Sequence, residues 1–285
     1  MTTLARALST LWHLVAVILR PALFVLVGLP AQVHPLLGLV PISVLVAAGM
    51  VLIFRFLSDQ ERIRQLRERM KGHLLGALVF SHSFRAVLGC LGRALAVNGL
   101  YLVHAFVPLL VMALPLVVLY VQLQHWYGWR PAKAGEECLV LARYRGQEAP
   151  AASLSTPGGS DWQVGPGYTF PSARAIVWAV QPTGQSNGSL IVSAGGAEVG
   201  KAVVAGGHRL VPLSPLRTDG TRVVDGFLYP LEPLLPAGSP IESIAFAYPS
   251  RRPPGEPWYT HWAAWFTGLT IVAGLVWSKV FRVTL

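Results

Sequence analysis

Three long apolar runs constrain this chain more than any other feature. They cover residues 36–54, 100–123 and 262–277. A helix needs about 20 largely apolar residues to cross the hydrocarbon core of a bilayer. The overall composition agrees, because 53% of the 285 residues are hydrophobic and only 13% are charged, against roughly 25% charged in soluble domains. The sequence therefore predicts an integral membrane protein with at least three spanning helices.

The N-terminal segment, residues 1–34, allows two interpretations. Residues 11–29 are long enough to cross a bilayer, but Arg20 and Pro21 lie at their centre, and a central Arg costs about 2.5–3.5 kcal/mol on insertion scales. Polar residues recur at helical spacing before that point: Thr3, Arg6, Ser9, Thr10, His13 and Arg20. One polar stripe is typical of an amphipathic helix that lies in the membrane interface. An interfacial helix and an extra span both remain open.

The distribution of charge predicts the orientation of the spans. Residues 131–257 hold ten Lys/Arg and ten Asp/Glu, whereas the rest of the chain holds 13 Lys/Arg and three Asp/Glu and so carries the whole net charge of +10. The basic excess lies beside the apolar runs, which excludes DNA binding as its explanation and places residues 55–93 in the cytoplasm by the positive-inside rule. Residues 131–257 are then outside. Seven aromatic residues are expected to anchor the outer interface: Trp126, Tyr127, Trp129, Trp258, Tyr259, Trp262 and Trp265.

The predicted fold is an α-helical membrane bundle with three certain spans and a possible fourth at the N-terminus, carrying two parts outside the membrane. The expected order is a transmembrane helix (35–57), a cytoplasmic helical hairpin of coiled-coil type (58–96), a transmembrane helix (97–125), an extracytoplasmic β-rich domain (131–257) and a last transmembrane helix (258–281). The hairpin has a first arm from residue 58, a break at residues 81–83 and a second arm at 84–96.

Residues 131–257 are dense in Gly and Pro and predict an all-β, sandwich-like domain. Strands are expected at residues 138–144, 175–180, 189–192, 202–205 and 244–248. Turns are expected at the glycine-rich sites 157–159, 165–167, 195–196 and 206–207. Asn187-Gly188-Ser189 fits a glycosylation acceptor, but a hairpin turn is the favoured interpretation.

Polar residues at the start of the 100–123 run are the main candidates for a functional site. Asn98, Tyr101 and His104 are spaced by three residues and share roughly one helix face. Polar groups at that depth need partners or water, so they either pair with other helices or line a cavity open to the cytoplasm. Pro108 and Pro115 would bend this helix and help to open such a cavity.

The basic residues of the hairpin have two interpretations as well. They either form a solvated, positive-inside face or contact anionic lipid, the ribosome or a nascent chain. These residues are Arg62, Arg64, Arg67, Arg69, Lys71, Arg85 and Arg93.

No enzyme, metal site or cofactor is expected from the sequence. The chain has only two cysteines, Cys90 and Cys138, which excludes a disulfide framework and a cysteine-rich zinc site. The paired glycines lack the downstream Lys-Ser/Thr of a phosphate-binding loop. Cys138 is expected to be a core residue of a strand.

The order of parts resembles the minimal core of the YidC/Oxa superfamily of membrane-protein insertases, especially its three-span archaeal YidC-like members. The resemblance is one of topology and covers about 120 residues: the 36–54 span, the basic hairpin, the 100–123 span and the 262–277 span. The N-terminal amphipathic segment also looks like the interfacial helix that precedes the first core span in bacterial YidC. Here, however, the β-rich domain lies between the second and third core spans.

The resemblance implies an insertase or chaperone in a bacterial inner membrane, with nascent membrane proteins, the ribosome or other membrane subunits as partners besides lipid. A hydrophilic groove would hold polar parts of an incoming segment. The family's groove carries a basic residue in its first core span, and the nearest candidates in this chain are Arg55 and Arg20. A competing function is a membrane-anchored extracytoplasmic β-domain that acts as a binding or assembly subunit of an envelope complex.

Overall fold

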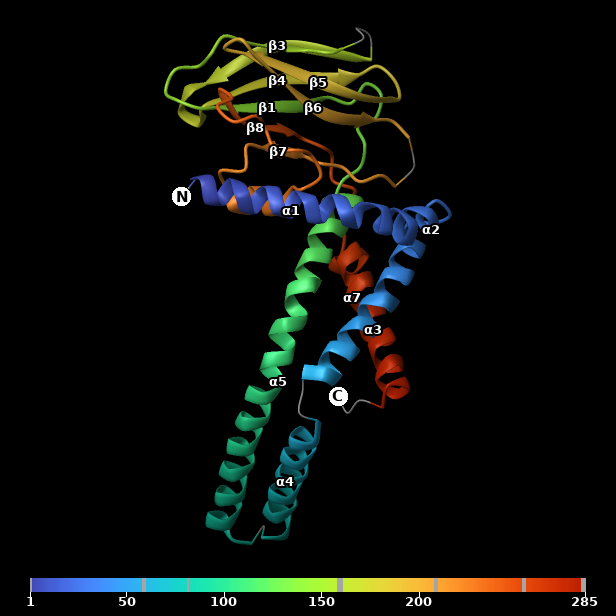
Figure 1. The fold of residues 1–285 in the computed structure, drawn as a ribbon. Helices are drawn as coiled ribbons and strands as arrows, with labels where there is room; N and C mark the ends of the chain where they lie inside the picture. Colours follow the sequence, from blue (N-terminus) through green and yellow to red (C-terminus); the bar gives the residue numbers. More distant parts are fainter. Residues whose placement is uncertain are drawn as a thin grey trace. The chain divides into compact units, whose positions relative to one another are not determined.

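A computed structural model describes residues 2–57, 60–80, 82–157, 161–207, 210–252 and 255–282 (Figure 1). The chain forms two compact units. Unit 1 comprises Met1–Gly38 and Tyr120–His261, and unit 2 comprises Leu39–Leu119 and Trp262–Leu285. Chain connections between the two units therefore occur at three points, after residues 38, 119 and 261.

Unit 2 consists of long, mostly apolar helices. They are α3 (Leu39–Leu57), α4 (Gln60–Val79), the larger part of α5 (Phe84–Tyr127) and α7 (Trp262–Val280). Helices α3 and α7 pack along each other. Within the described ranges, five segments are long and apolar enough to cross a membrane: Thr3–Ala31, Pro35–Leu57, Phe84–Val103, Pro108–Tyr127 and Trp262–Val280. The chain thus has several helices of the kind that a membrane protein requires.

Helix α5 is one continuous helix of 44 residues that contains both Pro108 and Pro115. At a rise of about 1.5 Å per residue it is about 66 Å long, roughly twice the thickness of a hydrocarbon core. Only part of α5 can therefore lie within a bilayer. The expected second hairpin arm (84–96) is the first part of this helix, and α4 precedes it.

The β-rich part of unit 1 has two antiparallel sheets (Figure 1). The five-stranded sheet has the order β3-β4-β1-β8-β7, and the three-stranded sheet has the order β2-β5-β6. The strands are β1 (Cys138–Tyr144), β2 (Ala152–Ser155), β3 (Trp162–Phe170), β4 (Ala175–Pro182), β5 (Ser186–Ala194), β6 (Ala197–Ala205), β7 (Leu216–Thr218) and β8 (Ile241–Phe246).

The two sheets share one apolar core. It is built from the inward-facing residues of both sheets, because side chains alternate between the faces of a strand. Strand β1 shows this alternation clearly, with Cys138, Val140, Ala142 and Tyr144 buried. Cys138 is thus a core residue, as expected. The separate antiparallel β region is confirmed, but a pure β-sandwich fits it only loosely, because helical segments complete unit 1.

Two turn predictions in the β-rich part are wrong. Gly165-Pro166-Gly167 lies within β3, where the pairing with β4 shifts between Val164 and Gly167; a bulge, rather than a chain reversal, accommodates these residues. Asn187-Gly188-Ser189 lies within β5 and pairs with β6. The turn at Gly195-Gly196 is present, and both residues have positive φ, which glycine adopts without steric cost.

Helical segments from two distant parts of the chain complete unit 1. The N-terminal part comprises α1 (Thr2–Leu23), the π-helical η1 (Phe24–Gly28), α2 (Leu29–Ala31) and the 3₁₀ turn η2 (Pro35–Gly38). The short helix α6 (Val223–Leu228) follows β7 and packs against α1. Two further 3₁₀ turns, η3 (Pro171–Ala173) and η4 (Trp258–Thr260), lie at chain bends.

Candidate functional site

The polar stripe of α1 binds a segment of the β-rich domain. Side chains from one face of α1 contact backbone carbonyl oxygens of residues 220–235, and each of these contacts joins residues more than 200 positions apart. The donors, acceptors and distances are Arg6 to Leu235 (2.8 Å), Ser9 to Gly220 (3.2 Å), Trp12 to Phe227 (2.8 Å), His13 with Pro230 (2.7 Å) and Arg20 to Leu231 (2.5 Å). Four of the six residues of the predicted stripe therefore form a docking face, whereas Thr3 and Thr10 are exposed.

Close packing supports these hydrogen bonds. The rings of Trp12 and Phe227 stack with centroids 4.8 Å apart. Ser9 is buried against two glycines, and a Cβ atom at Gly226 would lie 2.8 Å from the Ser9 Cβ atom. Gly220 has positive φ and also approaches Ser9. Glycine is required at both positions, because any side chain there would push α1 away from the domain.

The opposite face of α1 is apolar and exposed. Ala16, on the docked face, is 1% exposed, whereas Ile18 is 73% exposed. The other exposed apolar side chains of α1 follow the same helical spacing: Leu4, Leu8, Leu11, Leu14 and Val15. Helix α1 is thus amphipathic in an unusual sense, because protein covers its polar face and its apolar face is left uncovered.

The end of α5 is fixed in unit 1 by the same segment that receives α1. His125 is fully buried, and its two ring nitrogens lie 2.9 Å from the carbonyl oxygens of Leu213 and Leu228. The Tyr127 hydroxyl donates to the carbonyl of Pro35 (2.9 Å). The carbonyls of Phe227 and Leu228, at the end of α6, thus hold α1 and α5 respectively.

A fully buried lysine stabilises the same region from the side of the sheet. Lys201 in β6 is 0% exposed, donates to the Ser214 carbonyl (2.6 Å) and pairs with the carboxylate of Glu232. Glu232 also accepts a hydrogen bond from the Ala202 backbone amide (3.2 Å). Burial lowers the pKa of Lys201, and the charge of Glu232 opposes that shift. Because Glu232 follows Leu231, the ion pair holds the segment that Arg20 binds.

Sequence reasoning missed Lys201, although a signal was present. The run Val199, Lys201, Val203 occupies alternate positions of one strand, and all three are buried. A charged residue at an inward position of an alternating strand requires a buried partner. The partner itself could not be identified, because Glu232 lies in a loop 31 residues later.

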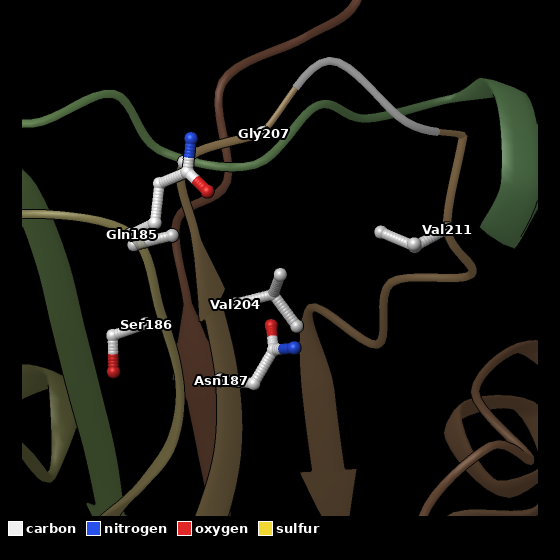
Figure 2. A pocket seen from close by; sticks show the side chains of 8 residues that line it. Gln185, Ser186, Asn187, Val204, Gly207 and Val211 are labelled. Carbon is white, nitrogen blue, oxygen red and sulfur yellow. The ribbon is translucent and has the colours of Figure 1, made fainter.

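A pocket lies where β5 begins and β6 ends (Figure 2). Its volume is about 650 Å³, and Gln185, Ser186, Asn187, Val204 and Val211 are among its lining residues. Figure 2 shows the Asn187 side chain beside that of Val204, its partner on the neighbouring strand. A neighbouring pocket of about 420 Å³ shares Gln185 and is lined by Arg130, Lys133 and Arg251. The two pockets offer amide and cationic groups to a ligand.

The predicted groove residues are distributed over both units. Asn98 and Tyr101 are partly buried on α5, and Arg55 is exposed in the last turn of α3, all in unit 2. Arg20 belongs to unit 1, where it binds Leu231. The side chain of His104 lies outside the described residues.

The hairpin residues belong to α4 and to the start of α5. Arg64, Arg69, Lys71, Arg85 and Arg93 are exposed, Arg67 is partly buried, and the side chain of Arg62 lies outside the described residues. Lys71 pairs with Glu68 (3.0 Å). Apolar side chains on both arms near the turn are also exposed, including Leu78 (72%) and Phe84 (80%). The sequence predicts the basic face, whereas the apolar end becomes evident only from the exposure.

The expected interface aromatics differ in exposure. Trp258, Tyr259 and Trp265 are exposed, Trp129 is partly buried, and Trp126, Tyr127 and Trp262 are buried within the protein. Trp126 packs against Gly28, where a Cβ atom would lie 3.0 Å from the indole ring. Trp126 and Tyr127 therefore contact other parts of unit 1, at Gly28 and Pro35, whereas the exposed aromatic side chains are free to contact the surroundings.

Comparisons with known proteins gave no relative. No protein-family model, no curated protein and no solved structure matches the chain. Among the described residues, no group of three or more His, Cys, Asp or Glu side chains could hold a metal ion. The function must therefore be argued from the arrangement of the chain's own residues.

Proposed function

We propose that this protein is a YidC/Oxa-like membrane-protein insertase or chaperone of a bacterial inner membrane. The observation that carries the proposal is the construction of α5. One helix of 44 residues supplies the second hairpin arm (84–96) and two candidate spans, Phe84–Val103 and Pro108–Tyr127, and Asn98 and Tyr101 lie partly buried near the end of the first span. A polar helix face at this level is what a groove open to the cytoplasm requires.

The packing of unit 2 supports the same function. Helices α3 and α7 pack along each other, and among the described residues α5 makes no comparably extensive contact with either of them. Its apolar side chains remain exposed, among them Leu102, Val103, Phe106 and Leu110. A helix with open apolar sides and a polar face can receive an incoming segment along its length.

The proposed mechanism is physical and involves no covalent step. Polar groups cost several kcal/mol each when they enter hydrocarbon unpaired. A wet groove beside Asn98, Tyr101 and His104 lowers that cost for the polar part of a substrate while its apolar face meets lipid. The basic and apolar surfaces of the hairpin receive the nascent segment before it reaches the groove.

Reconstitution into liposomes tests the proposal. Purified full-length protein is added to lipid vesicles, a single-span membrane protein is translated in their presence, and protease protection measures the inserted fraction. We expect the wild type to raise this fraction above that of empty vesicles. We expect Asn98→Leu with Tyr101→Leu to return it to the level of empty vesicles, because the helix face becomes apolar.

Val272→Ala with Val276→Ala is the matched control, since it changes two exposed apolar side chains of α7 and leaves the polar face of α5 intact. We expect this control to insert as the wild type does. Equal insertion by the Asn98/Tyr101 variant and the wild type would remove these residues from the mechanism. A wild type no better than empty vesicles would refute the insertase function.

The pocket of unit 1 favours a second candidate function, that of an anchored binding or assembly subunit. Gln185→Ala with Asn187→Ala alters the pocket lining without touching unit 2. The insertase proposal expects this variant to insert normally. If the pocket variant loses activity while the Asn98/Tyr101 variant keeps it, function resides in the β-rich domain.

A further inference from the structure

Two helices of unit 1 that pack against each other, α1 and α6, both expose apolar side chains, and these make up its apolar surface. Leu4, Leu8, Leu11, Leu14, Val15 and Ile18 are exposed on α1, and Val223, Val224 and Leu228 are exposed on α6. Figure 1 shows α1 (blue) and α6 (orange) beside each other on the side of the unit away from β3. The two helices are joined by the Ser9–Gly226 approach and by the Trp12–Phe227 stack.

The polar groups that would oppose burial of this surface in lipid are already satisfied. Arg6, Trp12, His13 and Arg20 direct their polar atoms to carbonyls of the β-rich domain. What α1 presents outward is a row of aliphatic side chains over at least four turns. Isolated exposed apolar residues are ordinary, but a continuous row marks an interaction surface.

Chain continuity indicates what covers the surface. Unit 1 is joined to unit 2 at three points, and at each of them a helix that is long and apolar enough to cross a bilayer begins or ends nearby. The last residue of α1 is only 16 positions before the first residue of α3. Because short connections join this surface to three candidate spans, the surface is held near the boundary of the bilayer. Lipid is therefore closer to it than a soluble partner is.

We infer that α1 and α6 together seat the β-rich domain on the outer leaflet of the membrane, with α1 lying in the plane of the bilayer. The occupant of the surface is the acyl-chain boundary below the lipid headgroups, where the apolar faces of such helices reside. The domain thereby has a fixed tilt, because five hydrogen bonds connect it to the helix that lies in the interface. The inference concerns unit 1 alone and does not depend on insertase activity.

Depth measurements on spin labels test the inference. The full-length protein, with Cys90→Ser and Cys138→Ala, carries single labels at Leu4→Cys, Leu11→Cys or Ile18→Cys and is reconstituted in nanodiscs of phosphatidylcholine and phosphatidylglycerol. Oxygen partitions into lipid and nickel chelates into water, so the ratio of their relaxation effects reports depth. A label at Tyr168→Cys, exposed on β3, is the aqueous control.

We expect all three α1 labels to favour oxygen over the nickel chelate and to lie at equal depth. These positions are seven residues apart, so a crossing helix would instead change depth by about 10 Å from each label to the next. Such a gradient would overturn the inference in favour of an additional span. Nickel accessibility equal to that of Tyr168→Cys would overturn it in favour of a surface that lipid does not cover.

A second copy of the chain is the remaining occupant that the test can detect. Dipolar broadening between labels at Leu11→Cys, removed by dilution with unlabelled protein, would show that two copies of α1 face each other and would also overturn the inference. A Leu11→Lys variant gives an independent check, because a charge on the lipid-facing side should shift the Ile18 label towards water. The same charge on a helix not in contact with lipid would leave that label unchanged.

Discussion

Removing the charge of Glu232 should strongly destabilise unit 1. Lys201 has no exposed surface, and its ammonium has two partners, the Ser214 carbonyl and the Glu232 carboxylate. Glu232→Gln keeps the size of the side chain and an oxygen for the Ala202 amide but leaves the buried charge uncompensated. Breaking a buried ion pair from one side costs about 3–5 kcal/mol, a large part of the about 5–15 kcal/mol that stabilises an ordinary domain.

Two further variants distinguish the effect of an unpaired buried charge from the effect of replacing these two side chains. Lys201→Met should cost less than Glu232→Gln, because the carboxylate that remains is 10% exposed and can reach water. The double variant, Lys201→Met with Glu232→Gln, should differ from the wild type by about 1 kcal/mol or less, since apolar replacements of buried pairs are often neutral. The expected loss of stability is therefore largest in Glu232→Gln, smaller in Lys201→Met and smallest in the double variant.

Hydrogen exchange of the full-length protein in nanodiscs measures these losses locally. For peptides covering residues 197–205 and 230–235, about 3–5 kcal/mol corresponds to a loss of protection of about 100- to 5,000-fold. The segment at 230–235 also binds Arg6 and Arg20, so exchange in α1 should rise with it. A loss of less than about tenfold in Glu232→Gln would refute the reasoning, because the pair would then contribute little.

The pH dependence of the same variant has a definite sign. Burial lowers the pKa of Lys201, and Glu232 is the group that opposes the shift. Without Glu232, Lys201 has a lower pKa in the folded protein than in the unfolded chain. At a pH between these two pKa values, Lys201 therefore binds fewer protons in the folded protein than in the unfolded chain. The free energy of unfolding of Glu232→Gln should therefore rise as the pH increases through this interval. A decrease over that interval would contradict the assignment.

Two other substitutions test packing and burial in unit 1. Gly226→Ala places a Cβ atom 2.8 Å from the Ser9 Cβ atom, so hydrogen exchange should increase throughout α1; Gly184→Ala, which meets nothing within 4 Å, is the control and should leave α1 protected. Burial raises the pKa of Cys138 and shields its thiol from reagents, so in a Cys90→Ser protein at about pH 8 maleimide should modify Cys138 far more slowly in the folded protein than in the denatured protein. Equal rates in the folded and denatured protein would show that the thiol is not buried as described.

The local pattern of the sequence predicts the elements whose stability is local. Strand β1 is predicted at its observed bounds because its residues alternate between core and surface, and the basic arm of the hairpin follows from helical periodicity. Gly165-Pro166-Gly167 is mistaken for a turn because glycine and proline favour bulges as well as turns, and only the pairing with β4 distinguishes them. Helix α6 escapes prediction because six residues form a helix only with support from α1.

For the candidate site too, the sequence predicts what depends on local spacing but not what depends on distant contacts. The sequence reveals the stripe of Arg6, Ser9, His13 and Arg20, because helical spacing is visible in a single chain. It cannot reveal what the stripe binds, since the acceptors are backbone carbonyls that every residue carries. Membrane interface, crossing helix and protein surface all require such a stripe, and the choice depends on residues more than 200 positions away.

The carbonyl acceptors also change the interpretation of the N-terminal hydropathy. Residues Thr3–Ala31 are long and apolar enough to cross a bilayer, and length alone would make them a span. Crossing, however, would give up five hydrogen bonds, each with a net value of about 1 kcal/mol, and would place Arg20 in hydrocarbon at about 2.5–3.5 kcal/mol. A helix lying in the interface keeps all five bonds and still buries its aliphatic row in lipid. The proposed position in the plane of the membrane therefore satisfies both the apolar content of α1 and its polar contacts, and depth along α1 discriminates between the two arrangements more sharply than hydropathy does.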